Sequence, residues 1–374
     1  MQINSPLSLL AGLSPEQFIL EYWQKKPLLI RQAIPNMQPL LTRTELFALA
    51  TQEEVQSRLV SQQKGQWSLK NGPFTKKTIP PITQREWSVL VQSVDQHNDD
   101  VRQLLNQFRF LPDARLDDLM ISYATEGGGV GPHFDSYDVF LLQAQGKREW
   151  RIGQQDDLTI IEGLPLKILK TFNPEQVLVL EPGDMLYLPP KYAHDGIALN
   201  ECMTYSIGFR APSEQELAAQ LLPKIADLLL DQEIDSPRFS DPHRQATETP
   251  ALLPQDMLDF ATQAIHKALA QPEILLQAMG EHWTELNANV WLEGSDWLDD
   301  CAGIELDRRS KMTYFTPFIF LNGDSFRAEG LDAQLMQKLA NQRDLMAEDI
   351  ALLTPEALAC IQDWCEQGWL ACFE

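Results

Sequence analysis

Apolar and polar positions in the first third of the chain follow mostly a helical period. After Ser14 the segment PEQFILEYW predicts a capped helix that ends before Pro27, because a proline disfavours helical backbone in the residue before it. The apolar residues 28–30 then predict a short buried strand. Apolar residues recur at helical spacing over 41–65 and 84–107, and a Gly/Pro/Lys-rich segment separates these two ranges. We therefore expect a helix in each range.

Near Leu119 the pattern changes to short runs typical of β-strands. Glycine-containing turns divide the runs LMISYA, DVFLLQA, KREWRI, QVLVL, DMLYLP and MTYSIGF. Several short strands joined by tight turns predict a sandwich or barrel, and the cupin type of jelly roll is one of these.

Helical spacing returns at Ser213, where Ser213-x-x-Glu216 is the signature of a capping box. A polar stretch over 233–250 joins the helix that begins there to a second apolar helix, MLDFATQAIHKALA. We expect the two helices to form an antiparallel hairpin, and their exposed apolar faces suit a dimer interface.

The remainder of the chain combines helices with one strong hairpin signal, Asn322-Gly323 between two apolar strands. This combination predicts a winged-helix-like module. The fold class is then α+β: a cupin or jelly-roll catalytic domain over 1–212, a helical dimerisation region over 213–273 and the winged-helix-like domain over 274–374.

Composition narrows the class of protein. A chain of 374 residues with 44% hydrophobic composition buries a large core, which excludes a disordered protein. No apolar run approaches the roughly 18 residues of a membrane helix, the opening residues do not resemble a secretion signal, and the five cysteines are odd in number and contain no CxxC pair. These features predict a cytoplasmic protein that does not bind membranes.

The net charge of −23 favours basic partners, because long-range Coulomb attraction steers a cationic partner toward an acidic surface. In the C-terminal region the only compact basic cluster is 308–311, so DNA is an unlikely partner and a protein-docking role is expected there.

His133 and Asp135 are the first half of a candidate metal site. On a strand, residues two apart leave the same face, at a spacing that suits one ion. His194 follows a later turn and strand, EPGDMLYLPP, and in an antiparallel jelly roll it returns beside the first pair. Either histidine alone is more simply an ordinary strand-end residue. Together the three predict a facial triad of the non-haem Fe(II) oxygenases, whereas zinc more often takes a fourth protein ligand.

Arg148 is a candidate ligand for an acidic co-substrate. Strand alternation places it on the inner face with Trp150, and a buried guanidinium is costly unless an anion pairs with it. The far carboxylate of 2-oxoglutarate would satisfy it; an internal Asp or Glu is the alternative. Ser122 is a candidate hydroxyl donor to the same ligand, with Thr204 and Ser206 weaker candidates, and bonds to local backbone are the alternative for all three.

Three segments together resemble the JmjC-type cupin 2-oxoglutarate oxygenases, and in particular the bacterial ribosomal oxygenases that hydroxylate an arginine of large-subunit ribosomal protein sixteen. They are FILEYWQKKPLLI, GGGVGPHFDSYDVFLLQAQGKREWRIG and EPGDMLYLPPKYAHDGIA. The resemblance implies that His133, Asp135 and His194 bind Fe(II) and that Arg148 and Ser122 bind 2-oxoglutarate, with O₂ as the second co-substrate. It also implies hydroxylation of an arginine β-carbon in a basic ribosomal protein, and a homodimer formed through 213–273.

An arginine substrate needs an anionic or aromatic receptor, and Glu126, Tyr137 and Asp138 flank the metal motif at suitable places. Each of the three is equally compatible with an ordinary loop or strand-edge residue. Other functions remain open: a histidyl hydroxylase or a methyl-lysine demethylase of the same JmjC class, or a non-catalytic metal-binding cupin that acts as an adaptor.

Overall fold

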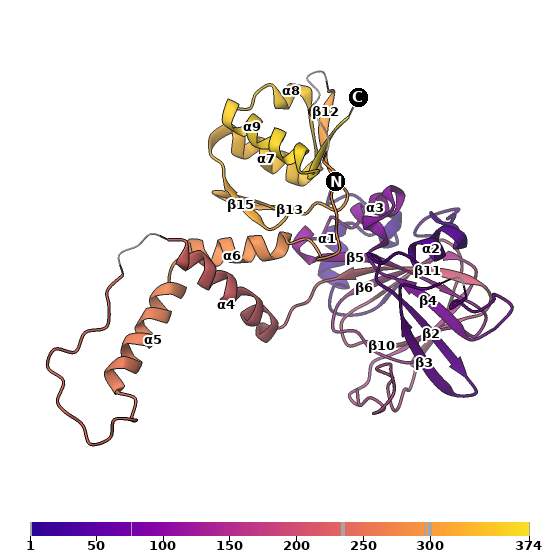
Figure 1. The fold of residues 1–374 in the computed structure, drawn as a ribbon. Helices are drawn as coiled ribbons and strands as arrows, with labels where there is room; N and C mark the ends of the chain where they lie inside the picture. Colours follow the sequence, from indigo (N-terminus) through magenta and orange to yellow (C-terminus); the bar gives the residue numbers. More distant parts are fainter. Residues whose placement is uncertain (1, 76, 233–235, 295–296, 298–300, 374) are drawn as a thin grey trace. The chain divides into compact units, whose positions relative to one another are not determined.

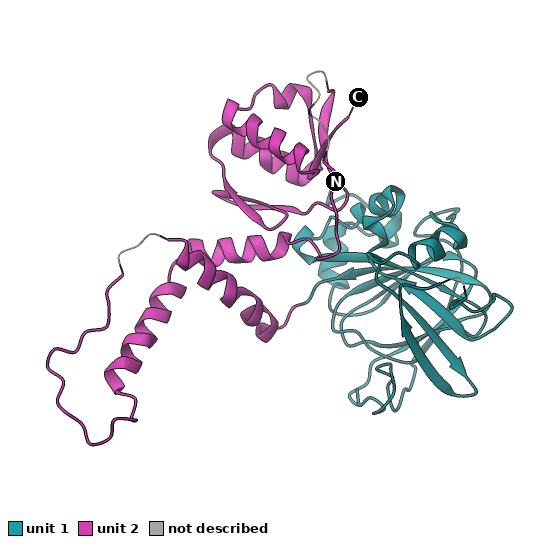
Figure 2. Ribbon diagram, in the orientation of Figure 1, with its two compact units in different colours: residues 1–211 teal, residues 212–374 magenta. Residues whose placement is uncertain are grey.

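The structure is a computed structural model that describes residues 2–75, 77–232, 236–294, 297 and 301–373. The chain divides into two compact units, 1–211 and 212–374, which are coloured separately in Figure 2. The further division of the second unit at residue 273 stays a prediction.

Two antiparallel sheets form the first unit (Figure 1). The large sheet has the order β1-β9-β6-β11-β5-β4-β2-β3 and the small sheet the order β10-β7-β8. The bounds in the large sheet are β1 (Leu28–Ile30), β2 (Ser57–Gln63), β3 (Gln66–Asn71), β4 (Trp87–Val91), β5 (Leu116–Ala124), β6 (Val139–Gln145), β9 (Met185–Leu188) and β11 (Cys202–Phe209). Those in the small sheet are β7 (Arg148–Gly153), β8 (Gln176–Leu180) and β10 (Ala193–Ala198).

Strand β6 shows why the large sheet is buried on both faces. Val139 and Leu141 point into an apolar cluster with Trp150 of the small sheet, whereas Phe140 and Leu142 point into the main core on the other face. The main core also receives residues from the helical segments η1 (Ser8–Leu10), α1 (Pro15–Glu21), α2 (Arg43–Leu49), η2 (Val94–Gln96) and α3 (Asp99–Asn106); η3 (Asp113–Arg115) directly precedes β5. The predicted jelly-roll-type core is confirmed.

Local sequence signals explain the first elements. The predicted helix begins at Pro15 because the Ser14 hydroxyl accepts a hydrogen bond from the Gln17 amide, and the Gln17 side chain accepts one from the Ser14 amide. The predicted strand over 28–30 is β1.

The expectation of helices over 41–65 and 84–107 is wrong for most of both ranges. The helical residues there are those of α2, α3 and the short 3₁₀ helix η2, and β2 and β4 are strands. Leu59 and Val60 are adjacent and both buried, and every residue of β4 is buried. A strand covered on both faces loses its alternation, so its apolar run cannot be distinguished from a helix by periodicity.

The second unit contains helices and two small sheets, ordered β16-β12-β17 and β13-β14-β15. Its elements are α4 (Glu214–Leu230), α5 (Gln255–Leu269), α6 (Pro272–Thr284), β12 (Gly303–Leu306), β13 (Met312–Phe315), β14 (Phe318–Leu321), β15 (Asp324–Arg327), α7 (Gly330–Gln342), β16 (Asp344–Met346), α8 (Ala347–Ile350), α9 (Pro355–Glu366) and β17 (Leu370–Phe373). The hairpin predicted at Asn322-Gly323 joins β14 to β15, and both turn residues have positive φ, as a type I′ turn requires.

The predicted hairpin of the helices at 213 and 257 is wrong, because α4 packs against α6 (Figure 1). The capping box at Ser213 starts α4 as expected. Leu221 and Ile225 of α4 are buried against Ile274 and Ala278 of α6, whereas α5 buries none of its residues. Among the described residues, no helix has the length and apolar character needed to cross a membrane.

Candidate metal centre

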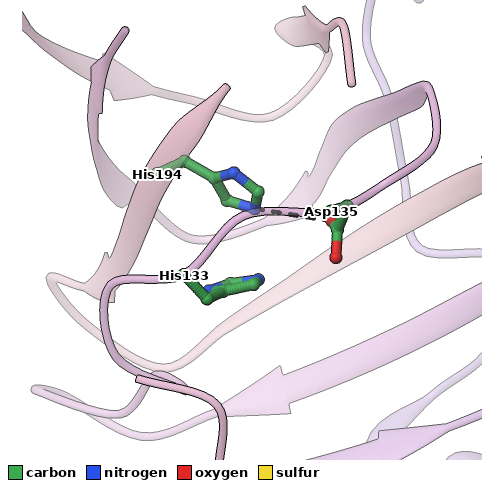
Figure 3. A group of neighbouring side chains, drawn as sticks. All are labelled: His133, Asp135 and His194. Carbon is green, nitrogen blue, oxygen red and sulfur yellow. Dashed lines mark ion pairs between the residues drawn. The ribbon is translucent and has the colours of Figure 1, made fainter. Parts of the chain in front are cut away.

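The side chains of His133, Asp135 and His194 converge at one point of the first unit (Figure 3). Their possible ligand atoms all lie within 4.8 Å of one another, and His194 Nε2 lies 3.7 Å from Asp135 Oδ2. The two imidazole centroids are 4.2 Å apart. The three side chains therefore lie close enough to share one ion.

Backbone hydrogen bonds bring the two histidines together. His133 and His194 form an isolated antiparallel bridge, in which the His133 amide donates to the His194 carbonyl at 2.9 Å and the His194 amide donates back at 2.8 Å. The Asp135 carbonyl accepts from the Lys191 amide at 2.7 Å. The expectation that 133 and 135 share a strand is wrong, since only the bridge at His133 is β structure, yet both side chains reach the same point.

Each imidazole ring is oriented by a contact between its Nδ1, the nitrogen that faces away from the other two side chains, and a backbone carbonyl. His133 Nδ1 lies 2.8 Å from the Gly131 carbonyl, and His194 Nδ1 lies 2.9 Å from the Tyr192 carbonyl. A carbonyl only accepts, so each Nδ1 carries the proton and each Nε2 keeps a free lone pair for a metal. Burial, with the nearby His133, lowers the pKa of His194 to about 4. His194 is therefore neutral near pH 7, as an imidazole ligand must be.

A cavity of about 510 Å³ adjoins the trio. Its wall contains all three side chains and the predicted co-substrate residues Ser122, Arg148, Thr204 and Ser206. A small acid can therefore lie beside an ion held by the trio.

Arg148 has the features expected of a residue that binds an anion. Its side chain is on the inner face of β7 and only 5% exposed, as predicted. One terminal nitrogen donates to Cys202 Sγ at 3.6 Å and the guanidinium lies 5.7 Å from the Trp150 ring centroid, but Nε is buried without a partner. Within the described part of the chain no carboxylate pairs with it, so the alternative of an internal salt bridge is not realised. The donors left over fit the carboxylate of a bound acid.

The hydroxyls at the cavity have protein partners as well. Ser122 Oγ donates to the Thr204 carbonyl at 3.3 Å, and Thr204 Oγ1 donates to Gln143 Oε1 at 3.0 Å. The alternative of a bond to backbone is therefore present for Ser122, whereas Thr204 bonds to a side chain. Ser122 nevertheless remains one of the residues that line the cavity.

Of the three predicted substrate residues, only Tyr137 lines the cavity. Glu126 lies outside the cavity wall and pairs with Arg85 at 2.6 Å. Asp138 is fully buried and lies outside the cavity wall. It accepts hydrogen bonds from Tyr187 at 2.6 Å, Gln24 at 3.0 Å and Arg115 at 3.4 Å, which fix the start of β6 to the N-terminal segment.

Sequence reasoning missed two acidic residues of the cavity wall, Asp117 and Asp118. Asp118 accepts bonds from the amide and the hydroxyl of Ser93, at 2.7 and 3.1 Å. Burial, followed by repulsion from Asp117 and Asp95, raises the pKa of Asp118 to about 7. Asp118 could have been predicted from the sequence. It lies four residues before Ser122 on the same strand, so alternation places both side chains on the same, inner face.

Comparison with known protein families gives two matches. The family model described as "JmjC domain" matches residues 103–217, and the model described as "ROXA-like winged helix" matches residues 267–371. The winged-helix-like C-terminal module predicted from the sequence is therefore confirmed.

Similar proteins cover most of the chain. "Ribosomal protein uL16 3-hydroxylase" of Escherichia coli (strain K12) is 40% identical over 268 residues, which is 71% of this chain and 69% of the relative. "Probable ribosomal oxygenase" of Haemophilus influenzae is 29% identical over 408 residues, covering 96% of each chain. The crystal structure of E. coli YcfD matches with a TM-score of 0.83 at 32% identity, covering 96% of this chain and 98% of that one. YcfD in complex with cobalt and 2-oxoglutarate matches with a TM-score of 0.80 over the same shares.

Proposed function

This chain belongs to the JmjC-domain ribosomal oxygenases, and from that premise we propose that it hydroxylates the β-carbon of an arginine in a large-subunit ribosomal protein. The co-substrates are 2-oxoglutarate and O₂, and the metal is Fe(II). The observation that carries the proposal is the pairing of a three-ligand cluster with a buried, unsatisfied arginine in one cavity.

We assign the metal to Nε2 of His133, a carboxylate oxygen of Asp135 and Nε2 of His194. Two neutral imidazoles and one carboxylate leave further coordination positions open to a keto acid and O₂. When bound, iron and 2-oxoglutarate supply the oxidising chemistry, and the protein supplies position and a dry cavity. The Gly131 and Tyr192 carbonyls fix the direction of both rings before any ion arrives.

Arg148 would bind the far carboxylate of 2-oxoglutarate, with Ser122 as a hydroxyl partner. The Trp150 ring and Cys202 hold the guanidinium inside the cavity. Because the site is buried, the charge pair is weakly screened by solvent, which strengthens it relative to a surface pair.

Asp118 and Tyr137 would receive the substrate guanidinium. A carboxylate and an aromatic ring in one wall suit arginine, which pairs with the former and stacks on the latter. These residues favour an arginine over a histidine substrate, because neutral imidazole gains little from a carboxylate. A non-catalytic adaptor has no need for an intact trio with an anion-binding arginine beside it.

The decisive experiment incubates the purified protein with Fe(II), 2-oxoglutarate, O₂ and a ribosomal protein fraction, and maps modifications by mass spectrometry. One oxygen added to an arginine of a large-subunit protein, absent with His133→Ala, is the expected result. Oxygen found only on histidine would favour a histidyl hydroxylase, and loss of a methyl group from lysine would favour a demethylase.

We also propose that two copies associate through 213–273. Met257, Leu258 and Ile265 of α5 are exposed by 43%, 58% and 59%, and α5 buries no residue within its own chain. An amphipathic helix is unstable without an apolar partner, which a second copy would supply. Sedimentation velocity should give a dimer for the unmodified protein and a monomer for Leu258→Glu; a monomer in both would overturn the assignment. A cytoplasmic location fits a ribosomal substrate.

A further inference from the structure

A flap of residues 159–170 borders the same cavity. Ile160 and Leu169 form an antiparallel bridge, the Ile161 amide donates to the Ile168 carbonyl at 2.8 Å, and the Lys170 amide donates to Thr159 at 2.8 Å. Three residues at its tip, Pro165, Leu166 and Lys167, line the cavity.

The base of the flap is fixed to the segment that carries the first metal ligand. The Leu169 amide donates to the Pro132 carbonyl at 2.8 Å, directly before His133. Ile168 is only 4% exposed. A Cβ on Gly131 would lie 3.0 Å from Trp67 and 3.1 Å from Ile168, so the base packs closely beside the glycine. The base of the flap is therefore attached to the segment of the metal site, and its tip lies at the edge of the cavity.

Lys167 is an exposed ammonium in the cavity wall, and it forms no ion pair or hydrogen bond with any described residue. Under the proposed function the other charges of the wall have tasks: Asp135 binds the metal, Arg148 binds 2-oxoglutarate, and Asp118 receives the guanidinium. Arg58, the other cation there, donates to Gln92 at 3.3 Å. Lys167 alone is left without a partner among these groups.

We propose that the flap is a specificity element, in which Lys167 pairs with an acidic side chain of the substrate peptide close to the hydroxylated arginine. This inference rests on the proposed function and adds a second recognition point to it. An ammonium repels a guanidinium, so Lys167 also disfavours entry of the arginine on the flap side and favours its approach to Asp118. Pro165 and Leu166 supply apolar surface for the neighbouring part of the peptide.

Lys170 is a matched control within the same flap. It is an exposed lysine at the base that is not part of the cavity wall, and its charge acts on Asp157. Replacing Lys167 or Lys170 by glutamate changes the net charge of the protein equally, so a difference between the two variants reports position rather than overall charge.

The experiment compares the unmodified protein, Lys167→Glu, Lys167→Met and Lys170→Glu with arginine peptides that carry Glu, Gln or Lys at each position up to three residues from the arginine. Binding is measured by fluorescence anisotropy with Mn(II) and 2-oxoglutarate without O₂, and KM and kcat are measured separately under turnover. For one Glu position, Lys167→Glu should weaken binding and raise KM by about tenfold while kcat changes little, as for one partly exposed ion pair and its reversal. Its preference should shift to the Lys peptide, and Lys170→Glu should behave as the unmodified protein does.

Equal behaviour of Lys167→Glu and Lys170→Glu, or an affinity that ignores peptide charge, would overturn the inference. The binding arm separates it from the proposed function: charge-dependent binding without added oxygen would leave the flap assignment standing and remove the hydroxylase, whereas added oxygen without charge dependence would do the reverse.

Discussion

Replacement of Arg148 by methionine should change protein stability and co-substrate affinity in opposite directions. Arg148 is 5% exposed, forms no ion pair with a carboxylate in the described structure, and has an Nε without a hydrogen-bond partner. Burying an unsatisfied polar group costs about 1–3 kcal/mol, and a cation costs more. Methionine fills a similar volume without that cost, so without 2-oxoglutarate the variant should be as stable as the unmodified protein or more stable by about 1–2 kcal/mol.

The co-substrate effect has the opposite sign. A charge-assisted hydrogen bond contributes about 1.5–3 kcal/mol, and a guanidinium makes two such bonds to a carboxylate. A net loss of about 3 kcal/mol corresponds to roughly 150-fold weaker binding of 2-oxoglutarate. Calorimetric unfolding without the acid, and titration of 2-oxoglutarate with Mn(II) under nitrogen, measure the two effects.

Arg151→Met is the matched control for this experiment. Arg151 lies on the same strand, is exposed and pairs with Glu149. Its replacement should leave 2-oxoglutarate binding unchanged and shift stability by at most about 0.5 kcal/mol. If Arg148→Met unfolds more easily than the control and binds 2-oxoglutarate normally, Arg148 is a structural residue and does not bind the co-substrate.

Three further predictions follow from the site. His194→Ala should remove the stabilisation of about 2.7 kcal/mol that metal at a hundredfold excess over its Kd gives the unmodified protein, as measured by unfolding with and without chelator; equal metal-induced shifts in both proteins would contradict the ligand assignment. Asp118, with Asp117 and Asp95 as acidic neighbours, is mostly ionised only above its pKa of about 7. The KM for an arginine peptide should therefore fall as pH rises from 6 to 8. Asp118→Asn should give a high KM without this pH dependence. Gly131→Ala should lower stability by about 1–3 kcal/mol, because φ is +80° there and the added methyl meets Trp67 and Ile168; an unchanged Tm would show that the flap base yields easily.

The inward direction of Arg148 could be predicted from sequence, because it depends on strand alternation, which is a short-range rule. The same rule suggested the approach of His133 and Asp135, although the two residues do not share a strand in the structure. The return of His194 was expected from an antiparallel fold, and a backbone bridge to His133 brings the two histidines together.

The fate of Asp138 could not be predicted in this way. Its partners are Gln24, Arg115 and Tyr187, which come from three other regions of the chain, and only the folded structure brings them together. The strands β2 and β4 were missed for a related reason, since burial on both faces depends on neighbours that are distant in sequence. The packing of α4 against α6 likewise depends on contacts between residues that are distant in sequence.

The reciprocal backbone hydrogen bonds between His133 and His194 show how the polypeptide positions two of the proposed metal ligands. Main-chain hydrogen bonds place the two imidazoles side by side, so the polypeptide backbone itself sets the spacing of the two nitrogen ligands. A change of side chain at position 133 or 194 would keep these main-chain hydrogen bonds and alter only the atoms offered to an ion.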